Sequence, residues 1–146
     1  MANEISYSII IPHKNIPDLL RRCLNSIPRR DDIQIIVVDD NSDPEKVDFK
    51  HFPGTGEKCV EVYFTKEGKG AGFARNIGLK HAKGKWVLFA DADDFFEKDF
   101  VASLDKYSMS NLDVIYFNSR DVDADSLKEL NVNRYIQQYF LGRLSK

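Results

Sequence analysis

The chain has 146 residues, a length typical of one domain with a single hydrophobic core. Its net charge of −2 leaves no basic surplus, so we do not expect binding to the phosphate backbone of nucleic acids. No apolar run approaches the roughly 20 residues of a membrane-spanning helix, and the first residues do not resemble a signal peptide. The only cysteines, Cys23 and Cys59, are too few for a disulfide framework or a set of metal ligands. They predict buried, reduced thiols and a cytoplasmic location.

The first half of the chain predicts three strands and two helices. Residues 7–11 predict a strand, followed by a helix over 16–27 whose apolar residues recur at steps of three and four, with Asn15 as its N-cap. A second strand over 33–38 leads into a long loop, 39–58, with room for one short helix. A third strand over 59–64 and a helix over 71–82 follow.

The second half continues the alternation of strands and helices. It predicts a strand over 85–90, a helix over about 97–109, a strand over 112–117 and a C-terminal helix over about 125–144. Most of the strand segments lack polar alternation, as strands covered on both faces do. We therefore predict a single α/β domain over 1–146, with a mainly parallel sheet, flanking helices and right-handed crossovers.

Polar clusters follow three of the predicted strands. The first strand is followed by Pro-His-Lys-Asn at 12–15, the second by Asp-Asp-Asn-Ser at 39–42, and the fourth by Asp-Ala-Asp-Asp at 91–94. Because parallel strands end at one edge of the sheet, the three clusters should meet where such sheets bind ligands. Simpler explanations stay open for the first two clusters, namely a strand end with a helix cap, and turn chemistry.

The third cluster is harder to explain by folding alone. The repulsion between two of its three carboxylates is on the order of 1–4 kcal/mol at ~4 Å. A divalent cation bound between them removes this cost. In an extended segment Asp91 and Asp93 would point the same way. Their hard oxygen ligands suit Mg²⁺ or Mn²⁺, which retain water molecules and take further ligands from phosphates. This cluster therefore predicts a phosphate site linked to a metal ion.

A glycine-rich segment precedes the second helix. Glycines at 68, 70 and 72 lead into a helix whose first turns carry Arg75 and Asn76, and exposed N–H groups at a helix start favour anions. The segment is not a dinucleotide fingerprint, because Arg75 occupies the third glycine position, and it contains no Gly-Lys-Ser/Thr. Alone, it indicates only an anion site.

Taken together, SIIIPHKN, IIVVDDNSD and GAGFARNIGLKHAKGKWVLFADADD resemble the nucleotide-sugar-binding half of family 2 glycosyltransferases, which have the Rossmann-like GT-A fold. The likeness runs from about Ser6 to Phe100 and rests on the combination, order and spacing of the motifs. It implies that the first and fourth strands lie side by side. It also implies seven donor-binding residues: Pro12, His13, Asn15, Asp40, Arg75, Asp91 and Asp93.

The resemblance also implies roles for these residues. The turn from Pro12 to Asn15 would lie against the nucleoside, with His13-Lys14 where the family usually carries Thr-Tyr. Asp40 would contact the base and Arg75 would lie near the nucleotide. The Asp-x-Asp pair, 91 and 93, would contact the ribose and hold the Mn²⁺ or Mg²⁺ that bridges the diphosphate.

The reaction that this family performs is transfer of a sugar, here expected from a UDP-sugar, to a hydroxyl of a glycan or lipid-linked acceptor, with inversion. Polysaccharide assembly in the cytoplasm, including the inner face of the membrane, is the setting that the resemblance implies. The general base comes from a later segment in relatives. We therefore expect a truncated domain without that base, and we interpret Asp121, Asp123 and Asp125 as solvated turn residues.

Two other protein classes share parts of this pattern. A receiver-type signalling domain would use Asp91 as its phosphorylated residue, but it would begin at the strand that ends in Asp39-Asp40 and would carry a lysine after the last strand. A phosphatase of the Asp-x-Asp class requires threonine two places after the second aspartate, where this chain has Phe95.

Overall fold

The structure is a computed structural model that describes residues 4–123, 125–130 and 138–143. Its elements follow one another in this order: β1 (Tyr7–His13), α1 (Pro17–Asn25), β2 (Ile33–Asp39), the 3₁₀ helix η1 (Phe49–His51), β3 (Val60–Phe64), α2 (Ala71–His81), β4 (Trp86–Phe89), α3 (Phe100–Asp105), β5 (Val114–Asn118) and β6 (Gln138–Arg143). None of the helices in the described part of the chain is long and apolar enough to cross a membrane.

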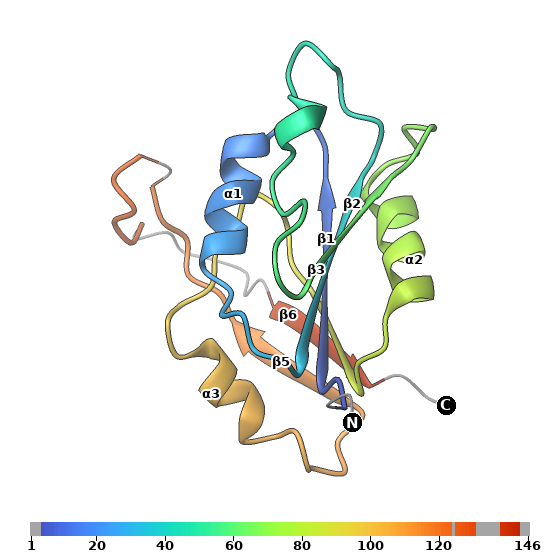
Figure 1. The fold of residues 1–146 in the computed structure, drawn as a ribbon. Helices are drawn as coiled ribbons and strands as arrows, with labels where there is room; N and C mark the ends of the chain where they lie inside the picture. Colours follow the sequence, from blue (N-terminus) through green and yellow to red (C-terminus); the bar gives the residue numbers. More distant parts are fainter. Residues whose placement is uncertain (1–3, 124, 131–137, 144–146) are drawn as a thin grey trace.

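The strands form one six-stranded sheet in the order β3-β2-β1-β4-β6-β5. The pairs β3–β2, β2–β1 and β1–β4 are parallel. β6 is antiparallel to both of its neighbours, β4 and β5. The predicted α/β fold with a mainly parallel sheet is confirmed, and so is the expected pairing of the first and fourth strands. Figure 1 shows α1 and α2 on opposite sides of β1, β2 and β3.

Alternation along the strands divides the core into two layers. Odd-numbered residues of β1 and β2 pack with α1 and α3 in the larger cluster, which includes Leu20 and Leu104. Even-numbered residues such as Ile10 and Ile36 pack with Ala74 of α2 in the smaller cluster. The same alternation continues past the ends of the strands, so that Asp39 lies on the α1 side of the sheet and Asp40 lies at the start of α2.

Several predicted elements differ from the structure. The C-terminal helix expected over 125–144 is wrong where the structure can test it, because residues 138–143 form β6, while 131–137 and 144 lie outside the described residues. Its side-chain pattern fits a helix, but pairing with β4 and β5 decides the backbone. The third helix is shorter than expected, since regular α-helix covers only Phe100–Asp105. β5 also exposes alternate side chains and is not covered on both faces.

The strand order decides against the receiver-type alternative. In the receiver fold the sheet order is 2-1-3-4-5, so the first strand lies between the second and the third. Here β1 lies between β2 and β4, and β3 is an edge strand. The presence of an antiparallel strand within the sheet is a second difference. We conclude that the interpretation of Asp91 as a phosphorylated residue of a receiver domain is wrong.

Candidate functional site

The predicted polar clusters meet at the carboxyl ends of β1, β2 and β4. The backbone N–H of Asp40 donates to the carbonyl of His13 at 2.9 Å, which continues the pairing of β1 with β2 beyond the strands. On the other side of β1, the N–H of Ala90 donates to the carbonyl of Ile10 at 3.0 Å. Asp91 follows directly. The convergence predicted from parallel strands is therefore confirmed.

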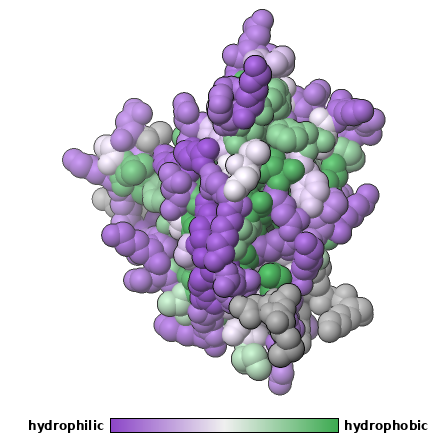
Figure 2. Space-filling model, viewed as in Figure 1, coloured by the Kyte–Doolittle hydropathy of each residue, from purple (hydrophilic) through white to green (hydrophobic). Residues whose placement is uncertain are grey.

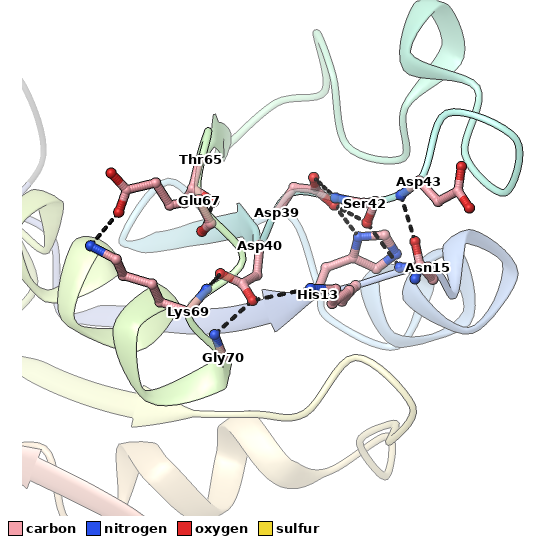
Figure 3. A network of polar contacts seen from close by, with 11 residues as sticks. His13, Asn15, Asp39, Asp40, Ser42, Asp43, Thr65, Glu67, Lys69 and Gly70 are labelled. Atoms are coloured by element: carbon pink, nitrogen blue, oxygen red, sulfur yellow. Dashed lines mark hydrogen bonds and ion pairs between the residues drawn. The ribbon is translucent and has the colours of Figure 1, made fainter.

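A buried network holds the loops after β1 and β2 together (Figure 3). His13 is 2% exposed and its Nδ1 lies 2.8 Å from Oδ1 of Asp39. The backbone N–H of Ile16 donates to Nε2 of the same ring at 3.2 Å. Nε2 is therefore the acceptor nitrogen of the ring, and Nδ1 carries the proton and donates a hydrogen bond to Asp39. Ser42 donates its hydroxyl and its backbone N–H to the Asp39 carboxylate. Because its ring is enclosed, the side chain of His13 cannot contact a ligand. Its role is to hold Asp39 and the start of α1 in position.

The electrostatics of Asp39 follow from this network. Burial alone would raise the pKa of its carboxyl group, but the hydrogen bonds from His13 and Ser42 outweigh burial and hold the pKa below its ordinary value. Asp39 is therefore a charged acceptor inside the protein, and its charge serves the architecture of the two loops.

Asn15 joins the same two loops and does not cap α1. Its backbone is in the left-handed region, with φ +60°, and the N-cap position of α1 is Ile16. The side chain Oδ1 of Asn15 accepts a hydrogen bond from the backbone N–H of Asp43 at 2.7 Å, and its own N–H donates to Oγ of Ser42 at 2.8 Å. The predicted capping role is wrong because the amide is directed across to the second loop.

Asp40 fastens the glycine-rich loop to the end of β2 (Figure 3). Its two carboxylate oxygens accept from the backbone N–H groups of Lys69, at 3.0 Å, and Gly70, at 2.8 Å. The Nζ of Lys14 lies 3.7 Å away, and Asp40 itself is only 2% exposed. A negative charge at the beginning of α2 also interacts favourably with the helix dipole. Asp40 therefore sets the position of the loop and of the first turn of α2.

The glycine-rich loop requires glycine at one of its positions, Gly70. Gly70 adopts φ +93°, which side chains rarely allow, immediately before the first residue of α2. A Cβ at Gly68 would lie 2.7 Å from Nζ of Lys14, but this atom ends a flexible side chain that can move aside. Gly70 is therefore the position at which the turn into α2 depends on glycine.

The Asp-x-Asp segment forms a turn. The N–H of Asp94 donates to the carbonyl of Asp91 at 3.1 Å, which closes a four-residue turn directly after β4. The expectation that Asp91 and Asp93 lie on an extended segment and for that reason point the same way is therefore wrong. Both residues are exposed at the rim. Arg75, from the second turn of α2, donates to Oδ1 of Asp91 at 2.5 Å, so the structure joins two of the predicted site residues in an ion pair.

Arg22 of α1 is a supporting residue that the sequence did not reveal. Its Nη2 donates to the backbone carbonyl of Asp93 at 2.5 Å, and its guanidinium lies over the ring of Phe95, 5.1 Å from the centroid. The carboxylates of the turn also act on α1 electrostatically. Burial first, and then the negative charges of the turn, raise the pKa of Cys23 to about 12. No motif marks Arg22, whose place on α1 looks like that of any solvated arginine.

The two cysteines differ. Both are free thiols, and Cys23 is buried as predicted. Cys59 is partly exposed, with φ +65°, and its thiol donates to the carbonyl of Arg30 at 3.2 Å, so the expectation that it is buried is wrong.

The residues of the turn fit a divalent cation that is shared with a substrate. Asp91 and Asp93 supply exposed hard oxygens, and the side chain of Asp91 is 53% exposed. Within the described residues, no group of three or more His, Cys, Asp or Glu side chains could hold a metal ion by itself. Mg²⁺ and similar ions accept such incomplete sites when waters and phosphate oxygens supply the other ligands. The side chains are therefore compatible with a metal that arrives together with a phosphate.

One of the acidic residues after β5, Asp123, has a local role. Oδ1 of Asp123 accepts from the N–H and hydroxyl of Ser126, and these bonds hold the pKa of Asp123 below its ordinary value. The segment closes on itself through a bridge between Val122 and Glu129. The interpretation of Asp123 as a turn residue is confirmed, and it makes a poor general base because a depressed pKa weakens its basicity.

Aromatic rings border the site on the α1 side. Phe52 is buried and packs edge-on against His13, at 5.2 Å between centroids, and against Phe64, at 5.0 Å. Phe49 and Phe64 are largely exposed and meet at 5.7 Å. Figure 2 shows hydrophobic side chains reaching the surface in the upper part of the view, around η1, with hydrophilic ones about them.

A separate hollow of about 270 Å³ lies at the amino ends of the strands, away from the candidate site. It is lined by Ile5, Asp31, Ile33, Gln34, Cys59, Val60, Glu61 and Lys83.

Comparison with known proteins shows the family to which the chain is similar. The sequence profile of the family described as "Glycosyl transferase family 2" matches residues 8–145. The chain is 35% identical over 116 residues to Glycosyltransferase GlyA of Streptococcus pneumoniae, covering 73% of this chain and 15% of that protein. It is 32% identical over 135 residues to the Poly(ribitol-phosphate) beta-glucosyltransferase of Bacillus spizizenii, covering 85% of this chain and 21% of that protein.

The fold is also similar to that of a solved structure. The S. aureus TarS fragment 1–349 in complex with UDP-GlcNAc superposes with a TM-score of 0.63 at 27% identity. The match covers 75% of this chain and 33% of the TarS chain. The chain thus spans only a minor part of the length of the proteins that it matches.

Proposed function

The chain belongs to glycosyl transferase family 2, and we propose that the rim formed by the loops after β1, β2 and β4 binds a nucleotide-sugar donor, most simply a UDP-sugar, together with Mn²⁺ or Mg²⁺. The observation that carries this proposal is the meeting of Asp40, Arg75 and the Asp-x-Asp turn at one edge of a mainly parallel sheet. A solved relative with this fold carries UDP-GlcNAc, which supports the choice of a uridine diphosphate.

In this proposal the charged residues contact the diphosphate in two ways, through the cation and directly. Asp91 and Asp93 hold the cation, and Arg75 approaches the diphosphate from the first turns of α2. When bound, the divalent cation supplies positive charge that stabilises the diphosphate as it leaves. Exposed backbone N–H groups at the start of α2 favour the same negative charge. Arg22 keeps the Asp-x-Asp turn in place through the carbonyl of Asp93.

The loop after β1 would form the wall of the nucleoside site. Pro12 is a buried residue near the end of β1. The turn from Pro12 to Asn15 is held by hydrogen bonds with Ser42 and Asp43, so its shape is already set before a ligand binds. His13 contributes through its backbone and through support of Asp39. Asp40 would set the position of the base of the nucleotide, because it holds the glycine-rich loop in place.

The transfer itself is proposed to invert the anomeric centre, with an acceptor hydroxyl as the attacking group. A carboxylate must remove the proton of that hydroxyl. We do not assign this general base within residues 1–146, and we place it in the acceptor part that longer relatives carry. In this proposal the chain is a single donor-binding domain, its acceptor is a glycan or a lipid-linked glycan, and its location is cytoplasmic.

The first experiment is a calorimetric and thermal-shift titration of UDP with and without Mn²⁺. At about 100 times the dissociation constant, a ligand adds ~2.7 kcal/mol of stability. For a chain of this size each kcal/mol corresponds to roughly 2–4 °C in Tm, so we expect a rise of about 5–10 °C with UDP and Mn²⁺ together. Asp93→Ala should abolish the metal-dependent part while its far-UV circular dichroism stays unchanged.

The matched control is Asp113→Ala, which removes another exposed carboxylate, just before β5. This variant should bind UDP and Mn²⁺ like the wild type. Unchanged binding in Asp93→Ala would refute the metal assignment. A thermal shift with acetyl phosphate or beryllofluoride, but none with UDP, would refute the nucleotide-sugar assignment altogether.

A further inference from the structure

The ion pair between Arg75 and Asp91 joins two residues that each have another role in the proposed function. Nη2 of Arg75 lies 2.5 Å from Oδ1 of Asp91. Under that proposal Asp91 also binds the cation and Arg75 also binds the diphosphate. A carboxylate that binds a metal ion attracts a guanidinium less strongly, and a guanidinium that binds a diphosphate attracts a carboxylate less strongly. The pair therefore competes with both ligands.

The geometry allows the pair to open. The side chain of Arg75 is 32% exposed and that of Asp91 is 53% exposed, so both charged groups can be hydrated when they separate. Arg75 extends from α2, and Asp91 belongs to the turn after β4, so their backbones lie on separate elements. Exposed pairs of this kind contribute ~0.2–1 kcal/mol. The exchange of partners is consequently within reach of ordinary ligand binding.

Charge balance decides what happens when only one ligand is present. A metal ion alone either displaces Arg75 from Oδ1 of Asp91 or binds the second carboxylate oxygen, and in both cases it leaves the guanidinium beside a second positive centre. A diphosphate alone must draw Arg75 away and leaves the Asp91 carboxylate beside a second negative centre. When both bind together, Asp91 keeps a cation as partner and Arg75 keeps an anion, so neither charge is left uncompensated.

We propose that the Arg75–Asp91 ion pair makes binding of the divalent cation and of the nucleoside diphosphate mutually dependent, by opposing each ligand alone and favouring the two together. This inference rests on the proposed function and adds to it a source of cooperativity within the protein. Because coupling between two ligands is reciprocal, each ligand must raise the affinity of the other by the same factor. Direct attraction between metal and diphosphate adds to this factor but does not depend on residue 75.

The proposal predicts effects of opposite sign for one substitution. In Arg75→Gln the competitor of the cation is gone, so Mn²⁺ alone should bind about two- to fivefold more tightly, the range that an exposed ion pair implies. UDP in saturating Mn²⁺ should bind about tenfold more weakly, because a charged partner of the diphosphate is lost. The coupling factor between the two ligands should fall. A residue with a merely structural role would not strengthen one ligand and weaken the other.

A substitution on the other side of the pair gives an independent measurement. In Asp91→Asn the guanidinium of Arg75 is released, so UDP without metal should bind about two- to fivefold more tightly than to the wild type. Arg75→Lys retains the charge but not the planar fork of donors. It should keep the wild-type affinity for Mn²⁺ alone and recover part of the affinity for UDP.

The experiment measures Mn²⁺ alone by electron paramagnetic resonance, UDP alone by calorimetry, and each in the presence of the other. Lys80→Gln is the matched control, because it removes one positive charge from an exposed position of the same helix. It should leave both affinities and their coupling unchanged. A similar gain in Mn²⁺ affinity for Lys80→Gln and Arg75→Gln would assign the effect to net charge and would overturn the inference.

The outcomes separate the inference from the proposed function. If the wild type binds Mn²⁺ and UDP cooperatively while Arg75→Gln binds Mn²⁺ no more tightly and keeps its coupling, the inference is wrong and the proposed function stands. If UDP does not bind to the wild type under any condition, the proposed function fails. The inference then fails as well, because coupling requires that both ligands bind. Absence of Mn²⁺ binding in both would overturn the two together.

Discussion

The attachment of the glycine-rich loop to Asp40 can be tested by Asp40→Asn. The substitution keeps the size of the side chain but replaces one acceptor oxygen by an NH₂ group. In the structure both oxygens accept backbone N–H groups, from Lys69 at 3.0 Å and from Gly70 at 2.8 Å. The amide oxygen of an asparagine can accept only one of these two N–H groups. The other N–H group would face the NH₂ group of the asparagine, a donor, at a position where the wild-type residue is only 2% exposed.

The expected loss of stability has two parts. A buried N–H group without an acceptor costs about 1–3 kcal/mol. Loss of the negative charge at the beginning of α2 costs ~0.3–1 kcal/mol more. A neutral amide is easier to bury than a carboxylate, which offsets part of this sum. We expect a net decrease in the free energy of unfolding of about 1–3 kcal/mol, equivalent to roughly 2–12 °C in Tm.

Urea denaturation and amide hydrogen exchange give the measurement. Asp18→Asn serves as the control, because Asp18 lies in the first turn of α1 and is exposed, so its substitution changes the helix dipole interaction alone. The difference between the two variants isolates the buried hydrogen bonds. The amide of Lys69 or of Gly70 should exchange faster in Asp40→Asn. Stability within 0.5 kcal/mol of wild type, with both amides still protected, would show that Asp40 does not hold the loop.

Two further predictions concern the core around the site. Because the folded-state pKa of Asp39 is lowered, its contribution to stability is present above the ordinary carboxyl pKa of about 4 and is lost as the pH falls below it. A carbon-13 titration of the Asp39 carboxyl group should therefore show a midpoint below that value, and Ser42→Ala should raise it; an ordinary midpoint in the wild type would contradict the network. In α2, Gly78→Ala should lower stability by about 1–2 kcal/mol despite the better helix propensity of alanine. The new Cβ would lie 2.4 Å from Cγ2 of Ile10, and a double-mutant cycle with Ile10→Ala in urea denaturation should show that the smaller residue relieves part of the loss. Additive effects would place the strain elsewhere.

The sequence alone determined the class of the fold and the edge at which the site lies. Short apolar runs identified the five strands that were predicted, and apolar residues at steps of three and four identified α1, because buried positions require apolar side chains. Polar residues directly after three strands indicated the functional edge, since parallel strands end together. The segment that became β6 shows the limit of this reasoning. Its apolar residues fit a helical face as well as a strand, and only pairing with β4 and β5 decides between them.

Tertiary structure decided the partners of the site residues. Asn15 looked like a helix cap, but its amide reaches a backbone N–H 28 residues away. Asp91 and Asp93 looked extended, but a turn and the bond from Arg22 set their positions. These contacts join residues that are far apart in the chain, and no local pattern records which of several available donors an acceptor will meet. The sequence therefore shows where charge is concentrated, whereas the packed structure alone determines how that charge is neutralised.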